Sequence, residues 1–477
     1  MNPQGRPAGE PPGAARGAEG VRVKAHAERV GRLVDAVDAA RRHGTLSIGL
    51  AKRTSNLFRD RQARSAPTID LAGFDQVLRV DADRALVEAE GMATFESLAD
   101  ATLARGHVPA VVPQLKSITL GGAVAGVGIE ASSFRHGLVH DTVVELDVLA
   151  GDGRVVRCTP DNEHRDLFLG FPNSYGTLGY ALRLVARTVP AKRFVHLAHA
   201  RHADATSFFA DLAAACGDAA VDFVDGVVFG RDVLVLTRAR FVDRVPSHGT
   251  GAGAPSDYTG ARIYYRSLLE RGEDWLAARD FLWRWDTDWF WCSRNVGAQH
   301  PLLRRLYGRR RLNSVTYQRI MRWNARLGFT RLADRLRGLH AEPVIQDVDV
   351  PLAAAPALLA FLHERVGILP VWVCPFAVPD ATRVATLYPL AADTLWVNFG
   401  FWDVVKSREP RPDGFVNRAI EREVAALGGR KSLYSESTYT EDEFWALHDR
   451  AAYRALKRRY DPQGALPDLY EKCVLRR

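Results

Sequence analysis

The sequence feature that most constrains the fold is a glycine-dense stretch at 119–128, where four of ten residues are glycine. Glycine lets the backbone approach a ligand closely and point N–H groups at anionic oxygens. Residues 126–131 also fit the G-x-G-x-x-A dinucleotide fingerprint, with Glu145 and Asp147 near the expected acidic position. The motif follows a loop instead of a clean strand, however, and Asp147 precedes a hairpin. A tightly packed turn and a cofactor cradle of another kind are therefore both open.

Elsewhere, predicted strands and helices mix without a steady β-α-β rhythm, which favours an α+β fold over a doubly wound sheet. Apolar spacing of three and four predicts helices over 27–43 and 95–105. Apolar or alternating runs bounded by turn residues predict strands at 46–49, 68–71, 76–80, 85–90, 143–149, 154–158, 180–188, 344–350 and 370–376. A helical tail is expected over 441–459.

Length and composition exclude several classes of protein. The 477 residues suggest two or three domains, since a domain averages about 150 residues. A content of 47% hydrophobic and 25% charged residues excludes a disordered, collagen-like or coiled-coil chain. No apolar run reaches the roughly 18 residues of a membrane span, and residues 1–20 resemble a disordered tail, not a signal peptide. Five scattered cysteines without a C-x-x-C pair favour a cytoplasmic location.

The net charge of +8 is concentrated in one segment. Residues 302–337 contain eleven arginines and one acid, with apolar residues at the spacing of a basic amphipathic helix. Only 8 of the 64 basic residues are lysine, so arginine clusters carry less functional weight in this chain. A solvated helix face is the default interpretation, and peripheral contact with the inner face of an anionic membrane is the sharper hypothesis. Nucleic-acid binding is not expected, because no recognised module accompanies the charge.

Other groups of reactive residues predict no separate chemistry. His196, His199 and His202 are spaced three residues apart. On a strand, side chains three residues apart point to opposite faces, so these histidines are not expected to converge on a metal. The chain lacks H-E-x-x-H, P-loop and G-x-S-x-G motifs, and neither a metal site nor hydrolase chemistry is expected. An aromatic belt at 283–291 is predicted to be core, or alternatively to line an apolar tunnel.

Several motifs resemble the FAD-binding (PCMH-type) domain of the vanillyl-alcohol oxidase and p-cresol methylhydroxylase superfamily. They are Gly121-Gly122, Gly128-Ile129-Glu130-Ala131-Ser132-Ser133, His136-Gly137-Leu138, Leu149-Ala150-Gly151-Asp152-Gly153 and Gly176-Thr177-Leu178-Gly179. More narrowly, the chain resembles the Delta(24)-sterol reductase (24-dehydrocholesterol reductase) branch. That likeness lies in Arg157-Cys158-Thr159-Pro160, Val189-Pro190-Ala191-Lys192, Val344-Ile345-Gln346-Asp347, Trp372-Val373-Cys374-Pro375-Phe376, Leu433-Tyr434 and Leu466-Pro467-Asp468-Leu469-Tyr470.

The resemblance implies a two-subdomain, α+β FAD-binding domain over 21–192 and an α+β substrate (cap) domain over 193–477. The tail of the second domain is expected to pack back near the flavin. FAD is expected to lie between the subdomains, with its pyrophosphate on backbone amides of 51–56, which contain no acid. The residues that the resemblance assigns to FAD are Ala51, Lys52, Arg53, Thr54, Ser55, Asn56, Gln114, Thr119, Leu120, Gly121, Gly122, Ile129, Glu130, Ser132, Ser133, His136, Gly137, Gly176, Thr177, Gly179 and Tyr180.

The resemblance also implies a reaction. NADPH is expected to reduce a non-covalently bound FAD, which then reduces an alkene of a sterol-like or isoprenoid lipid. Relatives that attach flavin covalently use a histidine of the first loop; 50–59 contains none, and His136 is interpreted as structural. The alternatives are an alcohol or sugar oxidase or dehydrogenase, similar to decaprenylphosphoryl-ribose or aldonolactone oxidases, and a basic membrane- or nucleic-acid-binding protein with a vestigial flavin fold.

For catalysis, the resemblance places Gln346, Tyr434 and Glu436 near the reactive face of the flavin. Alkene reduction needs a protonated acid in a dry site, for which Tyr434 or Glu436 is the candidate. Each also has a structural interpretation, as a satisfied strand residue, a core aromatic and a solvated acid. The related ribose oxidases carry an essential lysine where this chain has Ser435, with Lys431 four residues earlier, which weighs against the sugar-oxidase alternative.

Overall fold

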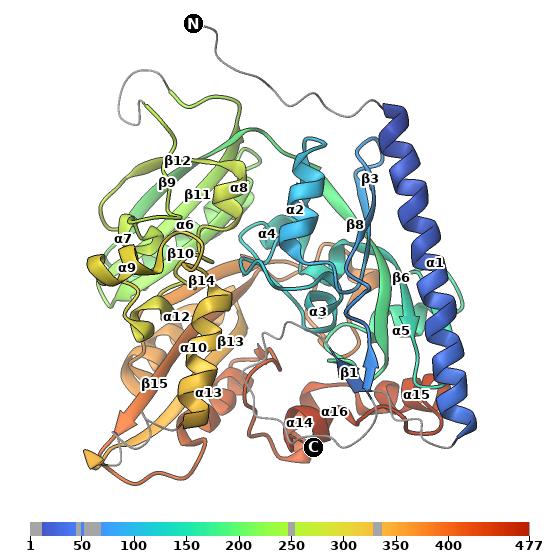
Figure 1. Ribbon diagram of the computed structural model, residues 1–477. Coiled ribbons are helices and arrows are strands. Elements are labelled where there is room, and N and C mark those ends of the chain that lie inside the picture. The colour runs from blue at the N-terminus through green and yellow to red at the C-terminus, as the bar shows by residue number, and fades with distance from the viewer. Residues whose placement is uncertain (1–11, 44–48, 52–67, 247–252, 328–335, 477) are drawn as a thin grey trace, which may run out of the picture.

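Two antiparallel β-sheets with flanking helices dominate the molecule (Figure 1). The computed structural model describes residues 12–43, 49–51, 68–246, 253–327 and 336–476. One sheet has six strands and lies before residue 191, the other has eight strands from residues 194 to 431, and a third sheet is a short parallel pair. Because the two large sheets are antiparallel and their helices lie on the faces, the fold is α+β, as predicted.

The first half of the chain builds the six-stranded sheet, in the order β3-β4-β8-β6-β7 with β5 also paired to β8. The strands of this half are β1 (Gly49–Ala51), β2 (Thr68–Asp70), β3 (Val77–Asp81), β4 (Leu86–Glu90), β5 (His107–Pro109), β6 (Val143–Leu149), β7 (Val155–Cys158) and β8 (Tyr180–Pro190). The helices are α1 (Pro12–Arg42), α2 (Phe95–Leu103), α3 (Leu120–Ala125), α4 (Ser133–His136), the 3-10 turn η1 (Val139–Thr142) and α5 (Arg165–Gly170).

Helix α1 begins earlier than the sequence predicts. The chain is helical from Pro12, so residues 12–20 are not part of a disordered tail, while residues 1–11 lie outside the described residues. Three alanines follow Pro12 within this stretch; alanine has the highest helix propensity, and proline is favourable in the first turn. The helix packs through Leu33 and Val37 onto Leu71 and Phe74. Of the strand expected at 46–49, only Gly49 lies in β1, and 44–48 lie outside the described residues.

The second half builds the eight-stranded sheet, in the order β12-β9-β11-β10-β14-β15-β13-β16. Its strands are β9 (Phe194–His202), β10 (Phe223–Gly230), β11 (Val233–Val242), β12 (Glu273–Ala277), β13 (His340–Pro351), β14 (Val371–Phe376), β15 (Trp396–Ser407) and β16 (Arg430–Lys431). Its α-helices are α6 (Ala205–Gly217), α7 (Tyr264–Ser267), α8 (Ala278–Leu282), α9 (Pro301–Tyr307), α10 (Ser314–Leu327), α12 (Ala355–Phe361) and α13 (Phe415–Ala426). Short 3-10 or π turns are η2 (Cys292–Val296), η3 (Leu352–Ala354), η4 (Leu362–Val366) and η5 (Ala381–Arg383).

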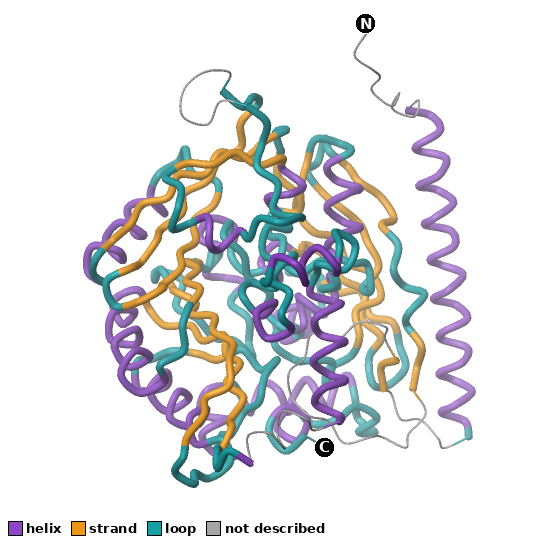
Figure 2. Tube along the Cα trace, turned by 60° about the vertical axis from the view of Figure 1, so that its left-hand side comes forward, coloured by secondary structure: helices purple, strands orange, loops and turns teal. Residues whose placement is uncertain are grey.

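The two faces of the eight-stranded sheet have different neighbours. Helices α6, α12 and α13 cover the face that we call the outer face, and they line the left-hand side of Figure 2. The opposite, inner face contacts loops of the first half: Val224 N donates to Ala131 O (2.8 Å) and Ala377 N to Ser133 O (3.3 Å). The inner face therefore meets the first half at the loop that carries the predicted cofactor residues.

The C-terminal tail returns to the first half of the chain. It contains α14 (Glu441–Leu447), α15 (Arg450–Tyr460) and α16 (Leu469–Cys473), which lie beside α5 and β1 in Figure 1. Asp152 N donates to Tyr460 O (3.0 Å), and Lys472 Nζ donates to the carbonyl of Tyr175 (2.6 Å). The predicted helical tail is interrupted because Asp449 caps a new helix. Among the described helices, none is long and apolar enough to cross a membrane.

Candidate functional site

Two strained loops of the first half pack against each other near the inner face. Val127 has a φ angle of 51° and Tyr175 one of 49°, and such angles in bulky residues are strained and concentrate at functional sites. A Cβ atom on Gly126 would lie 3.5 Å from the Tyr175 ring. The Tyr175 hydroxyl lies 3.3 Å from Ser432 Oγ, in the segment after β16. These contacts bring both loops and the chain's C-terminal segment to one place.

The glycine-dense stretch forms the start of α3. Thr119 caps this helix by accepting a hydrogen bond from Gly122 N (3.3 Å), and Leu120 N donates to Ala93 O (2.9 Å). A Cβ on Gly121 would lie 2.9 Å from Gly91 O, to which Gly121 N also donates (2.9 Å). At Gly121 the glycine is therefore required by close backbone packing, the packed-turn interpretation of this stretch.

A second group of predicted cofactor residues shapes the turn before β8. Gly176 has a φ angle of 77°, and Gly179 has one of 133° with no room for a Cβ, which would lie 2.5 Å from Leu149 O. Thr177 Oγ1 donates to Ser174 O (2.8 Å). Tyr180 opens β8 and is buried. These residues hold the Tyr175 loop in position.

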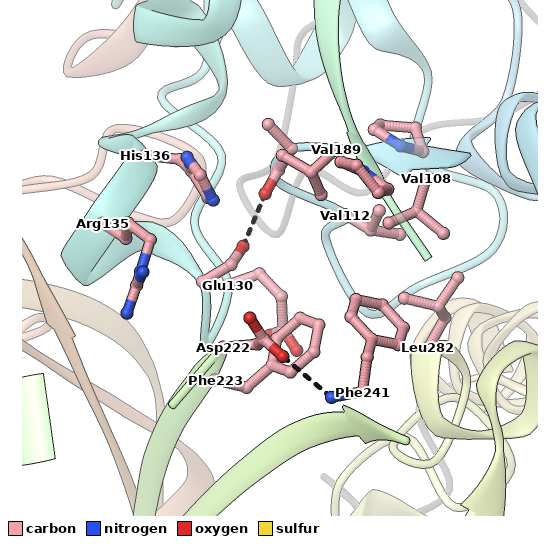
Figure 3. Close-up of a pocket in the computed structure, with 14 residues that line it drawn as sticks. Val108, Val112, Glu130, Arg135, His136, Val189, Asp222, Phe223, Phe241 and Leu282 are labelled. Carbon is pink, nitrogen blue, oxygen red and sulfur yellow. Dashed lines mark hydrogen bonds between the residues drawn. The ribbon is translucent and has the colours of Figure 1, made fainter. Parts of the chain in front are cut away.

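The loop that follows α3 lines a cavity of about 210 Å³ between the two halves (Figure 3). Glu130, Ser132 and His136 are polar members of its wall, with Arg135 and Asp222. Ser132 Oγ donates to Ala110 O (2.7 Å), and burial lowers the pKa of His136. Within the same loop, Ser133 Oγ accepts from Glu130 N (3.1 Å), Gly137 N donates to Ser133 O (2.9 Å), and Ile129 packs against the apolar core.

Glu130 belongs to a buried network that joins the two halves. Its Oε1 accepts from Arg284 Nη1 (3.0 Å), and Arg284 Nη2 donates to Asp225 Oδ2 (2.9 Å) on β10. Gln114 donates to the other carboxylate oxygen of Glu130. Two carboxyl groups share one guanidinium, and burial raises the pKa of Glu130 to about 7 although Arg284 lowers it. The side chains of Gln114 and Glu130 therefore position the loop relative to Arg284 and β10 of the second half.

The inner face carries a chain of hydrogen bonds that ends on a carboxyl group. Trp402 Nε1 donates to the Tyr434 hydroxyl (2.9 Å), which is hydrogen-bonded to Asp347 on β13. Asp347 lies opposite Gly400, and a Cβ on Gly400 would lie 2.7 Å from Asp347 Oδ1. That oxygen is buried and has no hydrogen-bond partner within the described part of the chain. Burial raises the pKa of Asp347 to about 7, although Tyr434 lowers it.

Asp349 lies two residues along the same strand face but has a complete set of partners. Asn398 Nδ2 donates to its Oδ1 (2.7 Å), and the Tyr388 hydroxyl donates to its Oδ2. Burial raises the pKa of Asp349 to about 6, against the effect of both hydrogen bonds. This face of β13 thus holds one satisfied carboxyl group, Asp349, and one, Asp347, whose Oδ1 has no partner among the described residues.

Gln346 lies on the outer face, because successive strand residues alternate between faces. It is fully buried, its Nε2 donates to Asn417 on α13, and Ser435 Oγ donates to its Oε1 (3.4 Å). Its neighbours Val344 and Val348 belong to the core beneath α12 and α13. The predicted catalytic residues Gln346 and Tyr434 therefore lie on opposite sides of the sheet.

Glu436 lies at the surface side of the tail segment. It is partly exposed and forms an ion pair with Arg476 (3.2 Å). Lys431 is fully buried against Glu421 (3.2 Å) and also donates to Ser437 Oγ (2.9 Å). This buried pair anchors the segment to α13, so the lysine is used to hold the segment and not to face the inner side.

The predicted pyrophosphate loop cannot be placed. Ala51 ends β1, whereas Lys52, Arg53, Thr54, Ser55 and Asn56 lie outside the described residues. The three histidines of β9, which were not expected to converge on a metal, have separate partners: His199 with Thr237, His202 with Asp211, and His196 with Glu273. Among the described residues, no group of histidine, cysteine and carboxylate side chains is arranged to hold a metal.

The inner face combines buried aromatic rings with buried polar atoms that have no hydrogen-bond partner within the described residues. The aromatic belt is buried on it: Phe290 packs on Trp402 with ring centroids 4.5 Å apart, and Trp291 lies 5.4 Å from the same ring. Besides Asp347 Oδ1, the buried atoms Asn398 Oδ1 and Trp291 Nε1 have no hydrogen-bond partner within the described residues. Because buried polar atoms are nearly always paired, a flat aromatic ligand with polar edges fits this surface.

Comparison with known proteins agrees with this chemistry. Residues 22–159 match the model of an FAD binding domain. The chain is 26% identical over 408 residues to the human Delta(24)-sterol reductase, covering 83% of this chain and 75% of that protein. The Delta(24)-sterol reductase of Pisum sativum is 25% identical over 445 residues, with coverages of 85% and 76%. Cytokinin dehydrogenase 7 of rice is 31% identical over 146 residues, 30% of this chain and 28% of that protein.

The fold, the site and these similarities define a flavoprotein, an FAD-dependent oxidoreductase. More narrowly, the chain is similar to the Delta(24)-sterol reductases along most of its length.

Sequence reasoning missed Asp347, although it named the residue before it. The signal was present: two carboxyl residues, Asp347 and Asp349, stand two apart in a predicted strand whose other residues, apart from Gln346, are apolar. Such spacing places both on one face of the strand, and two acids within a buried strand require a reason. The partners Trp402 and Tyr434 come from distant segments, and only the structure brings them together.

Proposed function

We propose that this protein reduces a carbon–carbon double bond of a sterol-like or isoprenoid lipid, with NADPH as the hydride donor. The reductases to which it is similar support the reaction type, and the aromatic inner face supports an apolar substrate. We further propose that dissociable FAD binds between two subdomains of residues 21–192, with its ring against the inner face. Residues 193–477 then form the substrate domain.

The observation that carries the proposal is the Asp347 carboxyl group. An isolated alkene is a poor electrophile, so it accepts a hydride only if the second carbon is protonated in the same transition state. Burial raises the pKa of Asp347 to about 7, so the group holds a proton near neutral pH, and its Oδ1 has no hydrogen-bond partner among the described residues. We assign the proton transfer to this residue and regard Tyr434 as the residue that positions it.

The proposed reaction consists of two half-reactions, reduction of the flavin by NADPH and reduction of the alkene by the reduced flavin. FAD, when bound, would supply the redox chemistry, the transfer of a hydride from NADPH to one alkene carbon. Asp347 gives its proton to the other carbon, and its carboxylate then recovers a proton from water. The Tyr434 hydroxyl, held by Trp402, fixes the orientation of the carboxyl group throughout. Phe290 and Trp291 of the aromatic belt pack against Trp402 and so support the residue that holds Tyr434.

An anaerobic absorbance experiment tests this direction of reaction. The purified protein is expected to show a flavin spectrum that acid precipitation releases into the supernatant. NADPH alone is expected to bleach the flavin, and a sterol with a side-chain alkene is then expected to restore the oxidised spectrum. Bleaching by an alcohol or sugar substrate, with no response to NADPH, would instead establish the oxidase alternative.

A further inference from the structure

Helix α9 exposes its leucines and buries an arginine, the reverse of the usual pattern for a helix at a water-exposed surface. Its Arg304 is only 4% exposed, whereas Leu302 is 69% and Leu306 is 76% exposed, with Leu303 at 43%. Burial of leucine is favourable by about 1.5–3 kcal/mol, so an exposed helix normally turns its leucines inward. Residues of α9 therefore present an apolar surface that a further apolar phase can cover.

The orientation of α9 is fixed by its buried arginine. Arg304 Nη1 and Nη2 donate to the two oxygens of Asp288, at 2.6 and 2.9 Å, and Arg304 Nε donates to Gly260 O at 2.6 Å. A buried, bidentate pair of this kind is strongly directional. Rotation of the helix to bury its leucines would break this pair, so the leucines are held outward.

Helix α10 extends the same surface. Tyr307 of α9 packs against Tyr317 of α10, with ring centroids 6.2 Å apart. The exposed residues of α10 include Val315, Arg319 and Trp323, spaced four apart along one face, and Trp323 is 62% exposed. A tryptophan with a neighbouring arginine is typical of the boundary between a membrane and water.

The distribution of apolar exposure and charge identifies what covers this surface. Twelve large hydrophobic side chains are exposed among those described, and six of them lie between Leu302 and Leu336. From Pro301 to Trp323 the sequence has seven arginines and no aspartate or glutamate. An apolar surface bordered by arginine matches a bilayer that carries negative headgroups, which supplies both contacts at once.

We propose that α9 and the exposed face of α10 dock on a membrane surface rich in anionic lipid. A second copy of the chain presents the same positive charge and would repel this surface, and a nucleic acid offers nothing to cover three leucines. The surface lies on the left of Figure 1, and α1 lies on the right.

Vesicle flotation of the purified full-length protein tests the proposal. Wild type is expected to float with vesicles of 70% phosphatidylcholine and 30% phosphatidylglycerol at about 0.1 M salt, and far less with pure phosphatidylcholine. Leu302→Ser with Leu306→Ser is expected to lower the partition coefficient at least about tenfold. Arg310→Gln with Arg319→Gln is expected to lower it by roughly fivefold for each arginine.

The matched control is Val21→Ser with Phe415→Ser, which removes two exposed apolar side chains from α1 and α13 and should leave flotation unchanged. A retained flavin spectrum and melting temperature show that each variant is folded. Equal loss in this control would overturn the proposal, as would absence of wild-type flotation. A wild-type dimer dispersed by Leu302→Ser with Leu306→Ser, or binding to DNA but not to vesicles, would also overturn it.

Discussion

The two faces of the eight-stranded sheet show how one element serves folding on one side and chemistry on the other. The outer face is an apolar core in which the buried amide of Gln346 is hydrogen-bonded to that of Asn417. The inner face holds three buried aspartates and several tryptophans, and some of its polar atoms have no partner among the described residues. A protein tolerates such unsatisfied groups where a ligand completes them.

The largest expected effect is on Asp347. Asp347→Asn removes the proposed proton donor at nearly constant shape, so turnover of the alkene substrate should fall about 10²–10⁴-fold, the usual contribution of general acid catalysis. The first half-reaction needs no protein acid, and NADPH should therefore bleach the flavin of this variant as fast as that of wild type. Stopped-flow absorbance without oxygen measures the two halves separately.

Asp349→Asn provides the matched control for this variant. Asp349 has the same strand, the same face and a raised pKa, but its two oxygens are occupied by Asn398 and Tyr388. Reoxidation by the alkene should stay within about threefold of wild type, since the exchange alters a structural contact only. Equal losses in both variants would show that inner-face polarity in general is needed and that Asp347 is not the donor.

The pH dependence should follow the same carboxyl group. The pKa of Asp347 is raised to about 7 by burial, so the acid is protonated below that pH and ionised above it. Reoxidation of the flavin by the alkene should be constant at lower pH and fall about tenfold per unit above pH 7. This alkaline fall should be absent in Asp347→Asn, whose residual rate has no such group to titrate.

Tyr434→Phe should change the position of this pH profile more than its height. The hydrogen bond from Tyr434 lowers the pKa of Asp347, so its removal should shift the alkaline fall to higher pH. Bound flavin should be retained, because the contacts of Tyr434 are with Asp347 and Trp402 of the eight-stranded sheet. A profile of unchanged position would place Tyr434 outside the proton path.

Much of the fold follows from local sequence patterns. Strands β6, β13 and β14 lie where apolar or alternating runs predict them, because each has at least one largely buried face. Helix α1 was predicted too short, since an alanine-rich, glycine-containing stretch has helix propensity without a hydrophobic period. Order in such a segment depends on the rest of the molecule, which a local pattern does not contain.

The site was less predictable because distant segments build it. Resemblance found the tail motif, and Tyr434 does lie on the inner face, but the side of the sheet that Gln346 occupies depends on strand register. A register shift of one residue moves every side chain of a strand to the opposite face. Such a shift would place Gln346 on the inner face and Asp347 on the outer face. Glu130 has similar ambiguity: its partner Arg284 lies 154 residues away in sequence.

Gln346→Leu should affect stability more than catalysis. The change removes the hydrogen bond that Gln346 Nε2 donates to the buried Oδ1 of Asn417, which costs about 1–3 kcal/mol in the free energy of unfolding. The flavin spectrum and the pH profile should be unchanged, because the side chain lies on the outer face. Urea unfolding measures the first quantity and anaerobic reoxidation the second. Loss of reoxidation without loss of stability would show instead that Gln346 takes part in catalysis.

The smallest effect is expected at Glu436, the other acid proposed from the sequence. Its carboxylate pairs with Arg476 at a partly exposed position, and exposed ion pairs contribute only about 0–1 kcal/mol. An acid that stays paired with a cation is a poor proton donor, since the pair favours the ionised form. Glu436→Gln should therefore leave reoxidation by the alkene within about threefold of wild type. A loss as large as that of Asp347→Asn would move the proton donor from the inner face to the tail segment.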